Sequence, residues 1–169
     1  MKIIISEKLP RIIKNKKRLE KILNVKITNR GKEISITGKP ADEYISEKVI
    51  DALNFGFPFS TAILLKKEDF IFEILNIKDY TKRKDLERIR ARIIGTKGKT
   101  LRTLSALTNC FFEIKENKVG IIGNSEFFEN AEESITSLIH GSKQANVYAH
   151  LEKTKLEPIF DYGLKKSKK

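Results

Sequence analysis

The hydrophobic and polar positions of this chain predict the same order of secondary-structure elements twice. Short alternating or continuous apolar runs are typical of strands. They occur at residues 2–6, 25–28, 33–37, 70–77, 110–114 and 119–122. Between these runs, apolar side chains recur three and four residues apart, as they do on one face of a helix. Each half of the chain therefore predicts strand, helix, helix, strand, strand, helix.

Glycines and polar turns mark where these elements end. Asn29–Lys32 and Glu116–Lys118 predict hairpin turns, because Gly and Asn tolerate the positive φ that tight turns need. The last helix of each half runs to a glycine, Gly56 in the first half and Gly141 in the second. Glycine is the residue most often found just beyond a helix C-terminus.

The two halves share positions that a duplicated fold would keep. Gly38 and Gly123 precede the last helix of each half, and Gly56 and Gly141 follow it, at a constant separation of 85 residues. Further matched positions are Ile50 with Ile135, Leu53 with Leu138, and Arg11-Ile12-Ile13 with Arg92-Ile93-Ile94, the last at a separation of 81 residues. An internal repeat of this kind indicates two copies of one fold.

Additional segments follow each copy. Residues 58–65 and 144–151 predict short helices, which we expect to pack the two copies together. The C-terminal residues 154–169 break the pattern, with an apolar stretch that predicts a docked segment and then a basic tail.

Composition narrows the class of partner. The 169-residue chain has 34 Lys and Arg against 22 Asp and Glu, which gives a net charge of +12 and a pI of about 9.7. Such a charge favours a polyanionic partner, although an anionic membrane surface or simple lysine-rich solvation fits it too. No apolar run is long enough for a membrane span, and no signal peptide is evident. The single cysteine, Cys110, excludes an internal disulfide and is expected to be a small buried residue, so we expect a cytoplasmic location.

The most informative stretch is the pair of glycines Gly95 and Gly98 between two predicted helices. Glycines let a second chain approach the backbone closely, and the N–H groups at a helix N-terminus attract phosphate. Lys97, Lys99 and Arg102 add positive charge at the same place. A bare G-x-x-G is weak evidence by itself, since an ordinary turn can use two glycines.

Catalytic chemistry finds little support in the sequence. His140 and His150 are ten residues apart and are expected to be structural or surface residues. No paired-carboxylate, nucleophile–base or metal-binding motif stands out, and Gly95–Thr100 lacks the spacing of a phosphate-binding P-loop. We therefore expect a protein that is not an enzyme and has no cofactor or metal.

The order of elements around the two glycines resembles the K-homology (KH) RNA-binding domain, whose G-x-x-G loop clamps about four nucleotides of single-stranded RNA. The resemblance implies an α+β fold with two tandem type I KH domains, each a three-stranded antiparallel sheet with helices on one face, plus extra short helices. The domains expected are residues 1–67, without G-x-x-G, residues 68–153, with the intact loop, and the C-terminal extension 154–169.

The resemblance also nominates the RNA-binding residues. They are Arg92, Ile93, Ile94, Gly95, Thr96, Lys97, Gly98, Lys99 and Arg102. Phe112 and Ile114 are candidates for an apolar groove but are better explained as core, and Phe111 should face the other way as a stacking or domain-interface residue.

In the first copy the loop position reads Lys14-Asn15-Lys16-Lys17, without glycine, so it should not clamp RNA in the usual manner. Lys14, Lys16, Lys17 and Arg18 form a basic loop with three open roles: a secondary phosphate contact, a solvated surface, or a region released to hold a protein or support its twin.

At the level of the family, the chain resembles the archaeal Dim-two (partner-of-Nob-one) ribosome-assembly factors, which are related to the Krr-one proteins. One departure is Thr96-Lys97 inside the loop, where the family often has Lys-Gly. The resemblance implies binding of single-stranded ribosomal RNA near the 3′ end of the small-subunit rRNA during pre-rRNA processing. The partners it implies are the precursor of the small ribosomal subunit, a Nob-one-type endonuclease and the alpha subunit of archaeal initiation factor two. The alternative is a KH adaptor in an RNA-degradation or translation-initiation complex that acts mainly through protein contacts.

Overall fold

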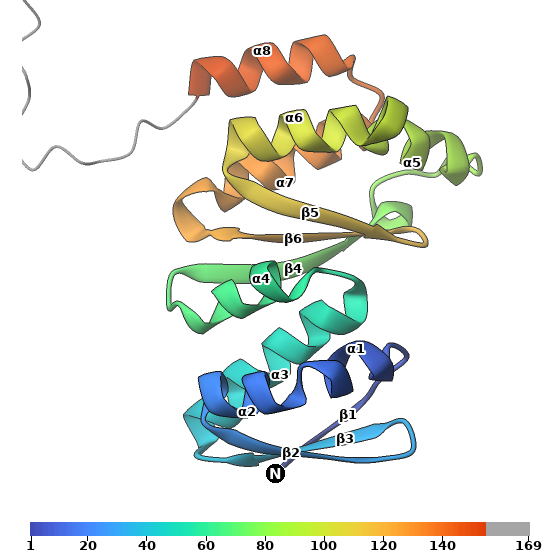
Figure 1. Ribbon diagram of the computed structural model, residues 1–169. Coiled ribbons are helices and arrows are strands. Elements are labelled where there is room, and N and C mark those ends of the chain that lie inside the picture. Colours follow the sequence, from blue (N-terminus) through green and yellow to red (C-terminus); the bar gives the residue numbers. More distant parts are fainter. Residues whose placement is uncertain (155–169) are drawn as a thin grey trace, which may run out of the picture.

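The computed structural model describes residues 1–154, in which two sheets alternate with layers of helices. Figure 1 shows the stack from bottom to top: the first sheet, helices α1 to α3, the second sheet, helices α5 to α7, and α8 on the outside. Both sheets are three-stranded and antiparallel. The α+β prediction is confirmed, and within each domain the domain's own helices cover one face of its sheet, as predicted.

The first domain is built from six elements. They are β1 (Lys2–Ile5), α1 (Leu9–Lys14), α2 (Lys16–Leu23), β2 (Val25–Arg30), β3 (Glu33–Gly38) and α3 (Pro40–Phe55). The strand order is β1-β3-β2. Ile34 and Ile36 on the central strand β3 are fully buried and belong to one core with Leu19 of α2 and Ile50 of α3. The alternation of β3 therefore places its apolar side chains against the helices.

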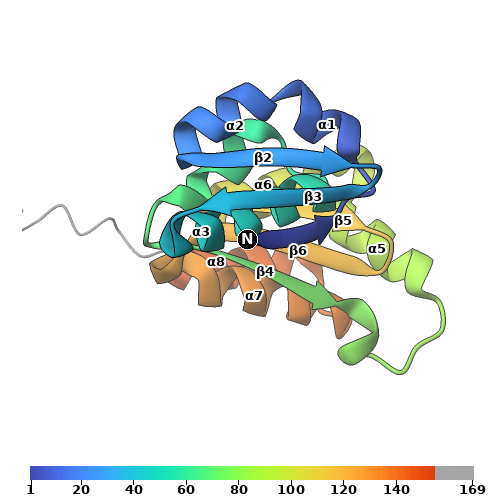
Figure 2. The ribbon, with the colours of Figure 1, turned by 90° about the horizontal axis from the view of Figure 1, so that it is seen from below.

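The second domain repeats this order and adds short helical elements. They are β4 (Phe70–Asn76), η2 (Ile77–Asp79), α5 (Leu86–Ile94), η3 (Thr96–Gly98), α6 (Lys99–Thr108), β5 (Cys110–Lys115), β6 (Lys118–Asn124), α7 (Ser125–Ile139) and α8 (Gln144–Thr154). The strand order is β4-β6-β5, so the last strand again lies in the centre. Figure 2 shows that α5 and the segment before it lie at one end of the molecule.

The two domains share a hydrophobic interface because the second sheet is covered on both faces. Phe72 and Ile122 face the first domain and pack into its core. The ring of Phe72 lies edge-on to Phe55 and Phe57, with centroid distances of 6.1 and 5.7 Å, an arrangement that aromatic rings favour. A Cβ at Gly120 would lie 2.6 Å from the Phe55 ring and 2.9 Å from the Phe57 ring. Glycine at this position lets the sheet approach the aromatic pair.

The two extra helical segments have different roles. Residues 58–65 form α4 (Phe59–Ala62) and the start of η1 (Ile63–Lys66), and they pack between α3 and β4, as predicted. Helix α8 instead packs against α6 and α7, with Val147 and Leu151 buried there. The expectation that α8 joins the two copies is therefore wrong. Its apolar side chains cover the far side of the second domain.

The predicted docked segment and basic tail lie outside the described residues, except for Thr154, which ends α8. Within residues 1–154, no helix is long and apolar enough to cross a membrane.

We expect Gly120→Ala to destabilise the whole protein. The added methyl group meets the Phe55 and Phe57 rings, and overpacking of a core costs about 1–3 kcal/mol. Because the interface is shared, urea unfolding followed by circular dichroism should give one transition at a lower midpoint. Thr28→Ala on the exposed face of β2 is the control, since such surface changes stay within about 0.5 kcal/mol. A midpoint equal to that of the unsubstituted protein would show that this contact is not tight.

Candidate nucleic-acid interface

The G-x-x-G loop connects α5 to α6 through a left-handed backbone. Gly95 has φ 74° and ψ 177°, a combination that essentially only glycine adopts. Lys97 (φ 55°, ψ 31°) and Gly98 (φ 75°, ψ 14°) follow in the left-handed helical region. A left-handed conformation costs a residue with a side chain roughly 1–2 kcal/mol. Lys97 holds this conformation although it has a side chain.

The two glycines are required for different reasons. A Cβ at Gly95 would lie 2.1 Å from Thr100 Oγ1, inside the protein. A Cβ at Gly98 would meet no atom within 4 Å. Gly95 therefore allows the loop to pack on α6, whereas Gly98 leaves bare backbone open to an approaching molecule.

The loop presents positive charge at the start of a helix. Gly98 is the N-cap of α6, no side chain accepts a hydrogen bond at this cap, and the first turn has no acidic residue. Lys97, Lys99 and Arg102 are exposed. Within residues 1–154 none of these three has an acidic partner at salt-bridge distance. The helix dipole and the three cations favour an anion at this end of α6.

Two of the nominated residues have other roles. Ile93 is fully buried in the core of the second domain, so its side chain is not available to RNA. Arg92 donates from Nη1 to the Leu138 carbonyl at 3.2 Å and from Nη2 to the Ser142 carbonyl at 2.5 Å. Its guanidinium therefore supports the end of α7, and its contact with RNA stays a prediction. Ile94 is half-buried, and Thr96 is exposed beside the loop glycines.

The sequence did not predict a hydrogen-bonded contact between the start of α8 and the helices that flank the loop. Gln144 Nε2 donates to the Arg92 carbonyl at 3.0 Å and to Thr100 Oγ1 at 3.3 Å. These residues are about fifty positions apart, and no local spacing signals their pairing. The start of α8 thus touches the ends of both helices that flank the loop.

Strand β5 is an edge strand of the second sheet and follows α6 in the chain. Its side chains alternate between the two faces of the sheet, as predicted. Phe112 is buried and Ile114 packs on the same core, as predicted. Phe111 pairs in register with Ile122, whose side chain faces the first domain, and remains 41% exposed. Cys110 is 1% exposed, and burial raises the pKa of its thiol to about 11. The thiol is therefore protonated and inert at neutral pH.

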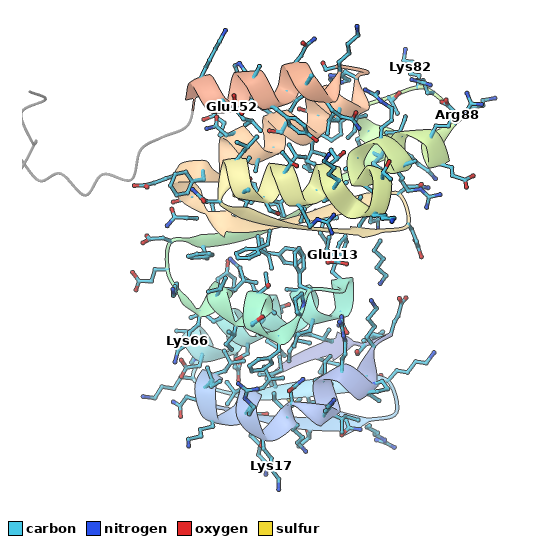
Figure 3. The ribbon with its side chains drawn as sticks, turned by 45° about the horizontal axis from the view of Figure 1, so that its top comes forward. Lys17, Lys66, Lys82, Arg88, Glu113 and Glu152 are labelled. Atoms are coloured by element: carbon cyan, nitrogen blue, oxygen red, sulfur yellow. The ribbon has the colours of Figure 1, made fainter. Side chains whose placement is uncertain are left out.

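The first domain brings charge to the same edge of the second sheet. Figure 3 places Glu113 of β5 between the two domains. A Cβ at Gly56 would lie 3.2 Å from Lys8 Nζ and 3.4 Å from Glu113 Cγ, so both side chains border this glycine. Burial raises the pKa of Glu113, while Lys8 and Arg11 act in the opposite direction. Arg11 itself donates to the Gly56 carbonyl at 2.9 Å.

The counterpart of the loop in the first domain is a tight turn. Helix α1 ends at Lys14 and α2 begins at Lys16, so only Asn15 lies between them, with φ −104°. The expected basic loop is therefore mostly helical. Lys14 and Lys17 are exposed, Lys16 is half-buried, and the Arg18 guanidinium lies over the Phe59 ring at 4.4 Å. Figure 3 shows Lys17 pointing away from the body of the protein.

A cavity lies apart from the G-x-x-G loop. A cavity of about 690 Å³ opens between the domains, lined in part by Ile5, Asp51, Ile74 and Lys115, and none of the G-x-x-G residues borders it. No group of three or more His, Cys, Asp or Glu within residues 1–154 is placed to hold a metal ion. His140 and His150 are exposed on the surface, as expected.

The order β-α-α-β-β-α, the central position of the last strand and the glycine loop between two helices define a type I KH domain in residues 70–139. In agreement, the family described as "Eukaryotic type KH-domain (KH-domain type I)", in its PNO1 form, matches residues 71–156. The chain belongs to the Dim2/PNO1-like family of KH-domain proteins.

Relatives of known sequence support this assignment. The KH domain-containing protein MJ0443 of Methanocaldococcus jannaschii is 28% identical over 145 residues, which cover 82% of this chain and 64% of that protein. The pre-rRNA-processing protein PNO1 of Kluyveromyces lactis is 35% identical over 105 residues, which cover 60% of this chain and 38% of that protein. The chain thus matches less than two thirds of the length of either relative.

Solved structures match over more of the chain. Dim2p from Pyrococcus horikoshii aligns with a TM-score of 0.82 and 28% identity, covering 90% of this chain and 98% of that chain. The protein in the a/eIF2alpha-aDim2p-rRNA complex from the same organism aligns with a TM-score of 0.81 and 30% identity, covering 91% and 93%. Both domains of the present chain are included in matches of this extent.

We expect alanine at the two loop glycines to have unequal effects on stability. Gly95→Ala combines a glycine-only conformation with a clash against Thr100, so we expect a loss of about 3 kcal/mol or more. Gly98→Ala adds only the left-handed strain of about 1 kcal/mol, because its Cβ enters open space. Gly31→Ala is the matched control, since Gly31 also has positive φ (60°) and no neighbour within 4 Å of a Cβ. Equal losses for Gly95→Ala and Gly98→Ala in urea denaturation would contradict the packing of Gly95 on Thr100.

Proposed function

We propose that this protein binds single-stranded RNA through the G-x-x-G loop of its second domain and serves as a non-catalytic assembly factor of the small ribosomal subunit. The observation that carries the proposal is the open backbone at Gly98, where a Cβ would meet nothing within 4 Å. A sugar-phosphate strand can press against this backbone only if no side chain stands there.

The charge around the opening supports the same ligand. Lys97 and Lys99 are exposed beside Gly98, and the uncapped N-terminus of α6 begins there. An RNA phosphate on the loop would accept hydrogen bonds from backbone N–H groups and be neutralised by these lysines. Arg102, one turn further along α6, extends the positive surface. Half-buried Ile94 offers an apolar contact for a base.

The biological role rests on the relatives. The K. lactis relative is named a pre-rRNA-processing protein, and the similar P. horikoshii protein was crystallised with rRNA and a/eIF2alpha. On this basis we propose that the RNA is single-stranded rRNA near the 3′ end of the small subunit. The proposed protein partners are a Nob-one-type endonuclease and the alpha subunit of archaeal initiation factor two, within the precursor of the small subunit. The cytoplasmic location stays a prediction.

The first domain has a secondary part in this proposal. Lys14 and Lys17 are exposed at its helix turn, without the glycines that would open the backbone. Side chains of this kind contact phosphates only as point charges. The Arg18 guanidinium is stacked on Phe59 and is thereby engaged in holding α4 to α2.

We expect the double variant Thr96→Asp with Lys97→Asp to weaken binding of a single-stranded oligonucleotide from the small-subunit rRNA 3′ end about tenfold or more. The change places two carboxylates where phosphate should lie, and it should lower the salt dependence of binding by roughly 0.7 in slope for each lost phosphate contact. Fluorescence anisotropy over a series of salt concentrations measures both quantities.

The control is Lys26→Asp with Thr28→Asp on the exposed face of β2, which changes the charge equally at a distance from the loop. This variant should bind RNA nearly as the unsubstituted protein does. If the loop variant keeps full affinity, the RNA clamp is rejected, and a KH adaptor that acts through protein contacts becomes the better account.

A further inference from the structure

Hydrogen bonds join the two helices that flank the G-x-x-G loop to the corner between α7 and α8. Arg92, near the end of α5, donates from its guanidinium to the carbonyls of Leu138 and Ser142. In return, Gln144 at the start of α8 donates to the Arg92 carbonyl. The same side-chain amide reaches Thr100 Oγ1 in the first turn of α6. Helix α5 therefore donates hydrogen bonds to the corner, and the corner donates hydrogen bonds to α5 and α6.

These contacts bear directly on the loop conformation. Thr100 is 4% exposed, and its side chain packs on the Cα of Gly95 so closely that no Cβ fits there. The Gln144 amide therefore bridges the last turn of α5 and the side chain against which Gly95 rests. The loop it spans includes Lys97, a residue held at positive φ against its intrinsic preference. A strained backbone of this kind persists only when its surroundings fix it.

Helix α8 lies outside the β-α-α-β-β-α unit that forms the KH fold, so its contact with the loop is an addition to that fold. Val147 and Leu151 anchor α8 in the core of the second domain. Gln144 is held at the N-terminal end of this anchored helix, where the Lys143 carbonyl also accepts hydrogen bonds from the backbone N–H groups of Asn146 and Val147. The donor amide therefore comes from a fixed element and not from a free surface side chain.

We propose that Gln144 is a positioning residue for RNA binding, which sets the geometry of the G-x-x-G loop through Arg92 and Thr100 without touching RNA. The proposal rests on the proposed RNA-binding function but makes a claim about the loop that is measurable without RNA. In the free protein, Gln144 restricts the loop to the conformation that exposes the Gly98 backbone. Preorganisation of this kind raises affinity because less ordering is required on binding.

The test compares Gln144→Ala with Asn146→Ala, which removes an exposed amide side chain from the same helix. In NMR relaxation, Gln144→Ala should lower the backbone order parameters of residues 96–98 from a rigid value of about 0.85 toward about 0.6, while those of the first domain stay unchanged. Asn146→Ala should leave the loop rigid. An unchanged loop in Gln144→Ala would overturn the proposal whether or not the protein binds RNA.

The second measurement is RNA affinity against salt concentration. Loss of one or two hydrogen bonds that fix the loop should weaken binding about three- to tenfold. The salt slope should stay the same, because the number of neutralised phosphates does not change. A fall in the slope would instead mean that the substitution changes the number of neutralised phosphates, which a change of loop order alone does not do. Full affinity would mean that loop order does not limit binding. Either result would overturn the positioning role.

A double-mutant cycle with Thr100→Val separates this role from a general loss of stability. Valine keeps the shape of Thr100 but removes the hydroxyl that accepts from Gln144. If the two side chains act through one contact, Gln144→Ala should weaken RNA binding less in the Thr100→Val background than in the unsubstituted protein. Additive effects would contradict the bridge. If even the unsubstituted protein fails to bind RNA, the proposed function fails, and the relaxation experiment still decides the role of Gln144.

Discussion

The proposed activity depends on a backbone turn that reverses its handedness between two helices. Gly95, Lys97 and Gly98 all have positive φ, and only the two glycines adopt it without strain. The turn brings α5 and α6 close together and leaves the main chain bare at Gly98. The remainder of the second domain keeps this turn in place. Ile93 anchors the end of α5 in the core, and Arg92 and Gln144 form hydrogen bonds between α5 and the corner of α7 and α8.

The first domain covers the second sheet and lacks the open backbone of the second domain's loop. Its helix turn has a single linking residue, Asn15, with negative φ and therefore no exposed backbone of the same kind. Its aromatic side chains Phe55 and Phe57 instead cover the free face of the second sheet. The duplicated architecture thus separates two tasks: one copy presents the loop, and the other buries the sheet face that would otherwise be exposed. Lys8 and Arg11 place additional positive charge beside strand β5 at this junction.

Much of this arrangement is encoded locally and could be predicted. Periodicity located the strands and helices, and the glycines at 95 and 98 indicated the loop, because glycine adopts positive φ without strain. The inward direction of Phe112 and Ile114 followed from strand alternation. What local patterns do not encode is pairing over long separations. The bonds of Arg92 to Leu138 and Ser142 join residues about fifty positions apart, so the structural support that this predicted RNA contact gives to the end of α7 could not be read from the sequence. The packing of α8 on α6 and α7, instead of between the domains, likewise depends on contacts between distant parts of the chain, which local patterns do not show.

The central claim is that RNA phosphate meets the main chain of the second loop. The most direct measurement is an NMR titration of the ¹⁵N-labelled protein with a short single-stranded rRNA oligonucleotide. The account predicts that the amide signals of residues 96–99 move most, followed by those along the exposed face of α6. Changes concentrated elsewhere in the protein, with the loop amides unmoved at saturation, would contradict it.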